Sequence, residues 1–291
     1  MLLSMTGFGR AEQAVNDKTF LVEIRSLNGK QFDLRLLMPA LLKPYEFDIR
    51  SMISEKLERG SVECIITLKQ NGAAKPVTIN TVLAKAYYQP VAELASELNL
   101  NPGDILSTLL KLPDVITPST EMLTKDEWND FASLLGAALK DLIDHRKDEG
   151  KMLEDDLLLR IKNIELHQEV VGKFEPQRRI KIKEGLKKVL EENVGADNYD
   201  ANRLEQELIY YIEKIDISEE QIRLKNHCDY FKSVLKENDS SKGKKLSFIL
   251  QEVGREINTT GSKAYDSDVQ KSVVLMKDEL EKAKEQVLNV L

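Results

Sequence analysis

The C-terminal half of the chain carries the feature that most restricts its fold. From about Lys151 to Leu291 no run of residues alternates between apolar and polar as a strand does, and apolar side chains recur at helical spacing. Amphipathic helices bury their apolar sides by packing against one another. The sequence therefore predicts a C-terminal helical domain at residues 154–291, with the boundary near 150–155 and open to falling inside one long helix.

Apolar stripes mark the helices of this domain. One stripe comprises Leu204, Leu208, Tyr211 and Ile215 and continues after a register change with Ile217, Leu224, Cys228, Phe231 and Leu235; another comprises Leu246, Ile249, Leu250, Val253 and Ile257; the last comprises Val269, Val273, Met276, Leu280, Ala283 and Val287. The last stripe has coiled-coil spacing. Packing inside the chain and packing against a second copy both remain open.

The first seventy residues favour strands instead. Two runs, at 19–25 and 32–36, alternate apolar and polar residues, and Asn28-Gly29 between them predicts a hairpin. A helix is predicted at about Tyr45–Leu57 and a third strand at 62–68, and helices follow near 81–98 and 125–149. The expected fold class is α+β: an N-terminal α/β domain with antiparallel strands at 1–153, then the long-helix domain.

Composition excludes several classes of protein. The formal net charge of −7 gives no global positive field, so any RNA site must be local. Cys64 and Cys228 lie far apart without a CxxC spacing, which indicates reduced thiols rather than a disulfide framework or zinc ribbon. Neither a basic leader with a long apolar run nor a segment of ~20 apolar residues is evident, and we expect a soluble cytoplasmic protein without a membrane partner.

Common catalytic signatures are also missing. The sequence holds no HExxH, GxSxG or kinase set, so protease, lipase and kinase activities find no support. Gly7-Phe8-Gly9-Arg10 resembles part of a nucleotide loop but lacks the Walker lysine, and it is interpreted as a turn. Between Lys173 and Lys188 there are seven basic residues against two acidic ones. This run is either a nucleic-acid contact or a solvated helix face balanced by carboxylates elsewhere.

A first group of candidate site residues follows Ile215. If this segment is helical from Asp216, then Asp216, Glu220, Arg223 and His227 share one face. Two carboxylates and an imidazole suit a divalent cation such as Mn²⁺. The competing interpretation is a capping box, in which Asp216 caps the helix and Glu219 stands at its third position.

A second group lies on the next predicted helix and in the connector that follows it. Glu252 and Glu256 are four residues apart, where a shared cation would relieve their repulsion, and Arg255 is able to offset the charge of Glu252. An exposed charged helix face gives the same pattern. The connector Asn258–Lys263 has the hydroxyls and the cation to hold a phosphate oxygen, although an ordinary helix–helix loop looks similar.

Six blocks of the sequence together resemble the YicC-like family of endoribonucleases. They are Ser4-Met5-Thr6-Gly7-Phe8-Gly9, Glu23-Ile24-Arg25-Ser26-Leu27-Asn28, Arg59-Gly60-Ser61-Val62-Glu63, Arg203-Leu204-Glu205-Gln206-Glu207-Leu208, Asp216-Ile217-Ser218-Glu219-Glu220 and Glu252-Val253-Gly254-Arg255-Glu256-Ile257-Asn258-Thr259-Thr260-Gly261-Ser262-Lys263. The blocks occur in order from one end of the chain to the other. Gly29-Lys30 and Gly254 depart from the family pattern, which puts in doubt an arginine contact at the former and a ligand role at the latter.

The resemblance implies an N-terminal α/β domain, a helical C-terminal domain, a ring-like homo-hexamer and metal-dependent endoribonuclease activity that prefers Mn²⁺, with Mg²⁺ as the alternative. It implies RNA as partner and no role on DNA. The site expected from it has catalytic Glu220, His227, Glu252 and Glu256; RNA-binding Arg223, Arg255, Asn258 and Lys263; and metal-binding Asp216, Glu219, Glu220, Glu252 and Glu256.

Two other functions compete with an enzyme acting in RNA or small-RNA turnover. A non-catalytic RNA-binding adaptor that presents RNA to another nuclease needs the basic groups but not the carboxylates. A structural coiled-coil assembly protein, suggested by the stripe from Val269 to Val287, needs neither. The sequence also leaves open whether water or the ribose 2′-hydroxyl attacks the phosphate.

Overall fold

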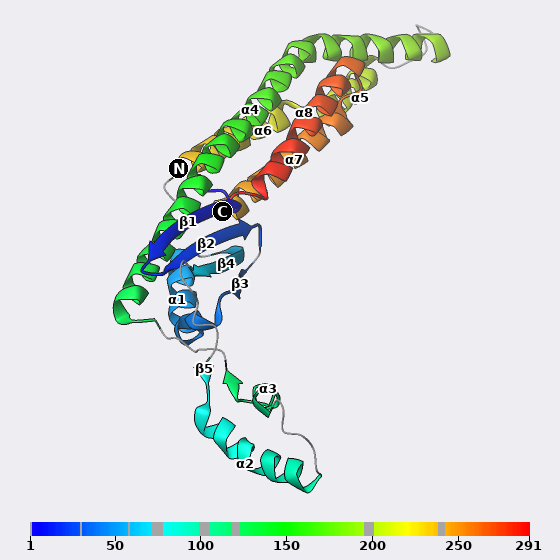
Figure 1. The fold of residues 1–291 in the computed structure, drawn as a ribbon. Helices are drawn as coiled ribbons and strands as arrows, with labels where there is room; N and C mark the ends of the chain where they lie inside the picture. The colour runs from blue at the N-terminus through cyan, green and yellow to red at the C-terminus, as the bar shows by residue number, and fades with distance from the viewer. Residues whose placement is uncertain are drawn as a thin grey trace.

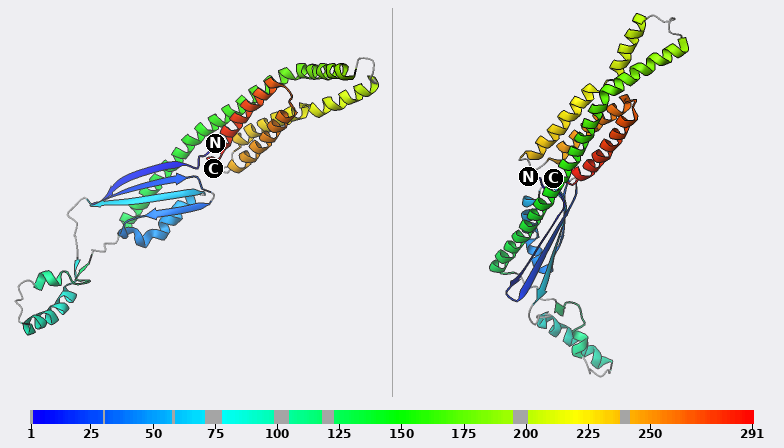
Figure 2. Two further views of the ribbon diagram at one scale, coloured as in Figure 1. Left: turned by 90° about the vertical axis from the view of Figure 1, so that its right-hand side faces the viewer. Right: turned by 90° about the horizontal axis from the view of Figure 1, so that it is seen from above.

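The chain forms an elongated molecule with a β-sheet near its middle (Figures 1 and 2). The computed structural model describes residues 2–29, 31–57, 59–70, 78–98, 105–117, 123–194, 201–237 and 242–291. A helical bundle extends from one end of the sheet, and a small helical unit lies beyond the other end. The ends marked N and C lie close together where the sheet meets the bundle, in all three views.

The sheet has four strands in the order β1-β2-β4-β3, with bounds β1 (Gly7–Val15), β2 (Lys18–Leu27), β3 (Phe32–Leu37) and β4 (Gly60–Gln70). Pairs β1–β2 and β2–β4 are antiparallel, whereas β3–β4 is parallel. The α+β class is confirmed, but the sheet is mixed rather than wholly antiparallel. A 3₁₀ helix η1 (Ala40–Tyr45) and helix α1 (Glu46–Lys56) connect β3 to β4, and such a crossover is what a parallel pair requires.

The predicted hairpin around Asn28-Gly29 is wrong. Strand β2 instead turns from β1 at Asn16 and Asp17, where Asn16 adopts a positive φ of 55°, a conformation that asparagine tolerates well in tight turns. β2 and β3 do not pair with each other, because β4 lies between them. The alternating pattern predicted the positions of β2 and β3 in the sequence but not that β4 would lie between them in the sheet.

Gly7-Phe8-Gly9-Arg10 is the beginning of β1 and not a turn. A Cβ atom at Gly9 would lie 2.2 Å from the backbone oxygen of Ala138. Helix α4 (Lys125–Val194) therefore packs directly on the backbone of β1, and only glycine leaves room for that approach. The motif serves the contact between sheet and helix.

Helices α1 and α4 share one hydrophobic core with the sheet. Phe20, on β2, contacts Phe131 of α4 edge-on, with ring centroids 5.3 Å apart. Trp128 stacks on Tyr45 at 4.1 Å. The helix predicted at Tyr45–Leu57 is confirmed as α1. Other members of this core include Val22, Ile24, Ile49, Ile53, Val62, Leu134, Leu135, Ala138 and Leu142.

Helix α4 has 70 residues and runs from the sheet far into the bundle (Figure 1). It begins with a reciprocal capping box: Thr124 Oγ1 accepts from the Glu127 backbone N–H, and Glu127 Oε2 accepts from the Thr124 backbone N–H at 2.9 Å. The boundary expected at 153/154 thus falls inside a continuous helix. Pro176 lies within the helix, and α4 changes direction in its far part (Figure 1).

The C-terminal bundle consists of the part of α4 that begins near Leu153 together with α5 (Ala201–Ile215), α6 (Ser218–Lys236), α7 (Gly243–Lys263) and α8 (Ser267–Val287). Every residue of the stripes predicted on α6, α7 and α8 is buried. The last stripe lies in a core shared with α4, α6 and α7, so packing inside the chain accounts for its burial. On α5, Leu208 and Ile215 are buried, while the side chain of Leu204 lies outside the described part.

A small unit projects from the far end of the sheet. It comprises β5 (Thr78–Ile79), α2 (Thr81–Glu97), α3 (Ile105–Leu109) and β6 (Ile116–Thr117), and β5 pairs with β6. Asn80 caps α2 by accepting from the Leu83 backbone N–H, and α2 has no buried residue. Within the described ranges, the helices all fall short of the length and apolar character needed to span a bilayer.

Candidate active site

Three helix ends meet around a buried arginine. The guanidinium of Arg178, on α4, donates to the backbone oxygens of Ile215 at 2.8 Å and Lys263 at 3.2 Å, which belong to the last residues of α5 and α7. Glu175 binds the same guanidinium through both carboxylate oxygens, at 2.7 and 2.8 Å. A cation at two helix C-termini is favourable because the helix dipoles place negative charge there. Arg178 therefore fixes where α6 begins relative to the end of α7.

The central contact of the site joins α6 to α7. Lys263 Nζ lies 2.7 Å from Glu220 Oε1 and donates at 3.0 Å to the backbone oxygen of Asp216. The Glu220 side chain is 6% exposed and that of Lys263 is 31% exposed. The carboxylate is thus enclosed by protein, while the ammonium is reached by solvent from one side. Two candidate residues from separate sequence blocks are brought into direct contact.

A second contact follows along the same interface. Gln221 Nε2 donates to Thr260 Oγ1 at 3.3 Å. These two contacts set an antiparallel register between α6 and α7, which pairs Glu256 with the middle of α6, the turn that includes His227. Glu256 is buried and His227 is half-buried, in agreement with that register. Glu220 and Lys263 are in direct contact, and this register places His227 and Glu256 farther along the same pair of helices.

Several oxygen atoms in this interface have no hydrogen-bond donor. Glu220 Oε2 and Gln221 Oε1 are both buried, and neither accepts a hydrogen bond. Glu256 is only 9% exposed, and its carboxylate makes no hydrogen bond or ion pair within the described part of the chain. A fully buried acceptor without a partner, such as Glu220 Oε2, costs about 1–3 kcal/mol, whereas the Glu256 oxygens are not fully buried. Acceptors of this kind suit a cation or a substrate donor.

The remaining candidates lie at the surface. Arg223 pairs with Glu219, and Arg255 pairs with Glu252 at 2.7 Å, as expected from their spacing. Asn258 is exposed. The single face predicted for Asp216, Glu220, Arg223 and His227 is therefore wrong in part, since Glu220 is buried and Arg223 is exposed.

Asp216 engages the backbone at the start of α6. Its Oδ1 accepts from the Ser218 backbone N–H at 3.2 Å and from the Ser218 hydroxyl at 2.8 Å. Asp216 thus engages a backbone amide as the capping interpretation expects, but the N-cap position of α6 is Ile217, which makes no side-chain cap hydrogen bond. Glu219 does not reach back as a capping box would require, because the Arg223 side chain holds it.

Two sequence interpretations need correction. The supposed connector at Asn258–Lys263 is the end of α7, and the hydroxyls of Thr259 and Ser262 donate to carbonyl oxygens of their own helix. These hydroxyls form no loop for a phosphate. The basic run from Lys173 to Lys188 also loses one member, because Arg178 is 1% exposed and holds the helix ends together.

A metal ion was expected at Asp216, Glu219, Glu220, Glu252 and Glu256. The described ranges contain no group of three or more His, Cys, Asp or Glu side chains placed to hold an ion. Glu219 and Glu252 are engaged by arginines, whereas Glu220 and Glu256 retain free oxygens. The free oxygen of Glu220 fits a hard cation. A full ligand set would need oxygens from elsewhere, such as water, RNA phosphate or another copy of the chain.

Sequence reasoning missed Arg178, Glu175 and Gln221, and it gave the Thr260 hydroxyl a phosphate contact in place of its contact with Gln221. Thr260 and Gln221 lie within or next to the blocks that pointed to the site, so their position along the chain was a usable signal. Arg178 stands in a run of cations that looks solvated, and nothing in the sequence distinguishes it from its neighbours. Only the fold shows that it faces inward.

Comparison with known proteins decides the family. The family model described as "Endoribonuclease YicC-like, N-terminal region" matches residues 2–155, and "Endoribonuclease YicC-like, C-terminal" matches residues 168–291. The chain belongs to the YicC-like endoribonuclease family. A relative from Clostridioides difficile named "Probable endoribonuclease YicC" is 31% identical over 296 residues, and one of the same name from Haemophilus influenzae is 29% identical over 292 residues; each alignment covers 100% of both chains.

Five of the six YicC-like blocks gather at two places in the fold. The last two blocks meet through Glu220 and Lys263. The first three meet at the base of the sheet, where the Arg146 guanidinium on α4 contacts the Ser26 hydroxyl and donates to the Met5 backbone oxygen at 3.2 Å. Asn28 in turn donates to the Leu288 backbone oxygen at 2.7 Å. The N-terminal blocks join the two domains, and the C-terminal blocks build the candidate site.

Proposed function

We propose that this chain is a metal-dependent endoribonuclease that cleaves RNA at the α6–α7 interface and acts in RNA or small-RNA turnover. Membership of the YicC-like family supports RNA cleavage. The observation that carries the choice of site is the buried Glu220 carboxylate, held by Lys263 through one oxygen with its other oxygen unpartnered. A carboxylate and a cation beside each other supply the two charges that phosphodiester cleavage uses.

Different residues of this chain take different roles in the proposed reaction. Glu220 and Glu256 offer carboxylate oxygens, and they are the groups that would hold Mn²⁺ or Mg²⁺, an ion that acidifies water and stabilises charge on phosphate. Lys263, reached by solvent from one side, neutralises a phosphate oxygen. His227 carries a proton to or from the reacting groups. Arg223, Arg255 and Asn258 lie nearby on the exposed sides of α6 and α7, where they contact the RNA backbone.

We extend the proposal to a homo-oligomer, of which the family resemblance suggests a hexamer. The bundle exposes large apolar side chains that a second copy would cover: Ile209 is 59% exposed, Tyr210 64% and Ile222 63%. These residues lie on α5 and α6, next to the candidate site. A second copy placed there is also the natural source of further ligands for the ion. We expect this assembly to work on RNA in the cytoplasm and to have no role on DNA.

The experiment is cleavage of an end-labelled single-stranded RNA by the purified chain in Mn²⁺, Mg²⁺ or chelator, with Glu256→Gln alongside. The matched control is Glu281→Gln, which removes a carboxylate on α8 that is 67% exposed and pairs with Lys284. We expect cutting in Mn²⁺, none in chelator, at least ~100-fold slower cutting by Glu256→Gln and an unchanged control. Wild-type rates in Glu256→Gln at saturating metal would remove this residue from the site.

An RNA-binding adaptor is the second candidate, and one observation favours it. No set of three ligands converges within the described part of a single chain. The adaptor predicts RNA binding with no cleavage in any metal, and binding that Glu256→Gln leaves unchanged. If cleavage occurs, mapping the new ends separates attack by water, which leaves 5′-phosphates, from attack by the 2′-hydroxyl, which leaves cyclic phosphates.

A further inference from the structure

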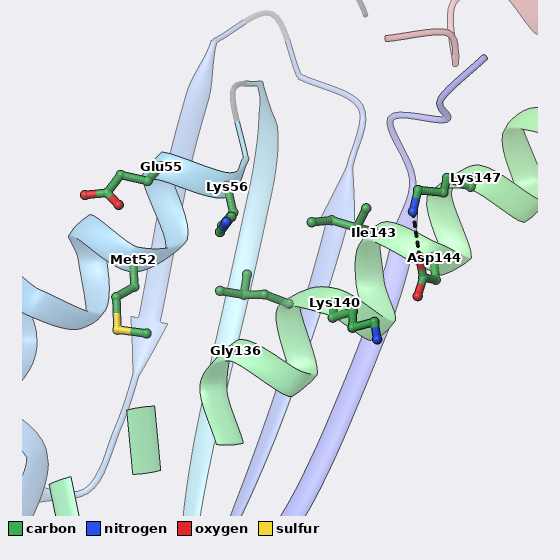
Figure 3. A pocket seen from close by; sticks show the side chains of 9 residues that line it. Met52, Glu55, Lys56, Gly136, Lys140, Ile143, Asp144 and Lys147 are labelled. Atoms are coloured by element: carbon green, nitrogen blue, oxygen red, sulfur yellow. Dashed lines mark hydrogen bonds and ion pairs between the residues drawn. The ribbon is translucent and has the colours of Figure 1, made fainter. Parts of the chain in front are cut away.

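A groove between α1 and α4 lies on the N-terminal domain, away from the α6–α7 site (Figure 3). Its volume is about 430 Å³, within the ~300–1,000 Å³ typical of ligand sites. Met52, Leu139 and Ile143 give it an apolar floor; the other lining residues are Glu55, Lys56, Gly136, Lys140, Asp144 and Lys147. It therefore combines an apolar surface with several charges.

The charges around the groove favour an anion. Lys147 is paired with Asp144 at 2.8 Å, whereas Lys56 and Lys140 make no hydrogen bond or ion pair within the described ranges. The hydrogen bond from Lys147, with Lys140 at longer range, lowers the pKa of Asp144. The Glu55 carboxylate points away from the floor, and the Ser51 hydroxyl donates to it (Figure 3). Two ammonium groups without partners among the described residues thus line the groove: that of Lys56 at the α1 side and that of Lys140, which extends along α4 toward Asp144 (Figure 3).

Gly136 forms part of the wall of the groove, and like Gly172 and Gly185 on the same helix it has open space where a Cβ atom would be. It lies inside α4, where glycine costs about 1 kcal/mol relative to alanine, yet a Cβ atom there would meet nothing within 4 Å. Packing therefore does not require glycine at this position, in contrast to Gly9. The absence of a side chain at Gly136 leaves open space at the wall of the groove (Figure 3).

We propose that the α1–α4 groove is an auxiliary RNA-binding site that holds one nucleotide unit of a substrate strand, with its base on the apolar floor and its phosphates at Lys56 and Lys140. The proposal rests on the proposed function, because it takes RNA as the substrate. A nucleotide matches both halves of the groove: an uncharged flat base and an anionic phosphate. The site anchors the strand at a distance from the α6–α7 interface.

The test is RNA affinity measured at several salt concentrations, with a single-stranded oligonucleotide in chelator and with the RNA checked for integrity afterwards. The variants are Gly136→Leu, which fills the groove, and Lys56→Gln/Lys140→Gln. The matched control is Lys162→Gln/Lys277→Gln, two exposed lysines that likewise have no partner in the described ranges. We expect ~10-fold weaker binding in both groove variants and a salt slope lower by about 1.4 in the lysine variant, with the control unchanged.

Gly136→Ala separates binding from folding. It should raise the stability of α4 by up to ~1 kcal/mol and at the same time weaken RNA binding, a combination that a merely structural role does not produce. Wild-type affinity and salt slope in all groove variants would overturn the proposal. So would tight binding of adenosine monophosphate with unchanged RNA affinity, or a change in oligomeric state in place of RNA binding.

The result also distinguishes this proposal from the proposed function. Because binding is measured without cleavage, an inactive α6–α7 site leaves the groove test intact. Failure of the wild-type chain to bind RNA at all would defeat both proposals. Normal wild-type binding that the groove variants do not change would defeat the groove alone.

Discussion

The capping box of α4 should make the stability of the N-terminal domain depend on pH. The Thr124 backbone N–H, and after it Lys18 and Asn16, lower the pKa of Glu127 from 4.5 to about 2 against the opposing effect of burial. Lys18 Nζ lies 3.1 Å from the carboxylate, and both side chains are less than a tenth exposed. The perturbation is Glu127→Gln, which keeps the shape of the side chain and removes its charge.

The size of the effect follows from the pKa. A carboxyl whose pKa falls from 4.5 to about 2 on folding contributes at most ~3 kcal/mol at neutral pH. Solvent near the helix terminus screens part of this, so we expect Glu127→Gln to lose ~1–2 kcal/mol. Because the folded-state pKa is the lower one, the contribution is complete above about pH 4.5 and disappears as the pH falls toward 2.

The single tryptophan of the chain reports on this region directly. Trp128 follows Glu127 and stacks on Tyr45, so its fluorescence during urea unfolding follows the start of α4. The difference between wild type and Glu127→Gln should be largest near neutral pH and shrink by roughly two fifths by about pH 3.5. Asp126→Asn, at an exposed acid of the same turn, should cost less than ~1 kcal/mol. A difference in the free energy of unfolding that does not change with pH would show that the charge of Glu127 does not stabilise the fold.

Further predictions concern the bundle and the thiols. Arg178→Met should lower the free energy of unfolding, measured by urea denaturation, by about 3–5 kcal/mol. The substitution removes the bidentate partner of the Glu175 carboxylate and the hydrogen-bond donor to two helix ends. Lys181→Met, at an exposed position, should lower the free energy of unfolding by less than ~0.5 kcal/mol. Equal losses in the two variants would contradict the role given to Arg178. Burial raises the pKa of both cysteine thiols to about 12, so a thiol reagent near neutral pH should modify neither in the folded protein and both after unfolding; rapid modification of either in the native state would show that it is accessible.

Sequence patterns predicted the elements of the fold better than their pairing. Stripes at helical spacing identified the buried sides of α6, α7 and α8, because burial on a helix follows directly from periodicity. The predicted pairing of β2 with β3 was wrong. The turn signal at Asn28-Gly29 was outweighed by the contacts that β4 makes with both strands, between which it lies. The capping box at the start of α4 has the Thr-x-x-Glu signature, which marks the beginning of a helix in the sequence itself.

The sequence predicted where the candidate site lies but not which of its side chains pair with each other. The blocks containing Glu220 and Lys263 pointed to one site, and the two residues do meet. Which carboxylates have partners depends on neighbours one turn away: Arg223 takes Glu219 and Arg255 takes Glu252, which leaves Glu220 and Glu256 with free oxygens. Arg178 contacts the ends of other helices, and the spacing of residues within one helix does not predict contacts between helices.

The most direct test of the account is the single-turnover rate of RNA cleavage by Glu220→Gln in Mn²⁺, with Glu281→Gln as control. Glutamine still accepts the hydrogen bond from Lys263, so the helix ends should stay in place and RNA affinity should change by less than about twofold. We expect the rate to be at least ~100-fold lower in Glu220→Gln and unchanged in the control. Cleavage by Glu220→Gln at the wild-type rate would show that the chemistry lies elsewhere in the molecule.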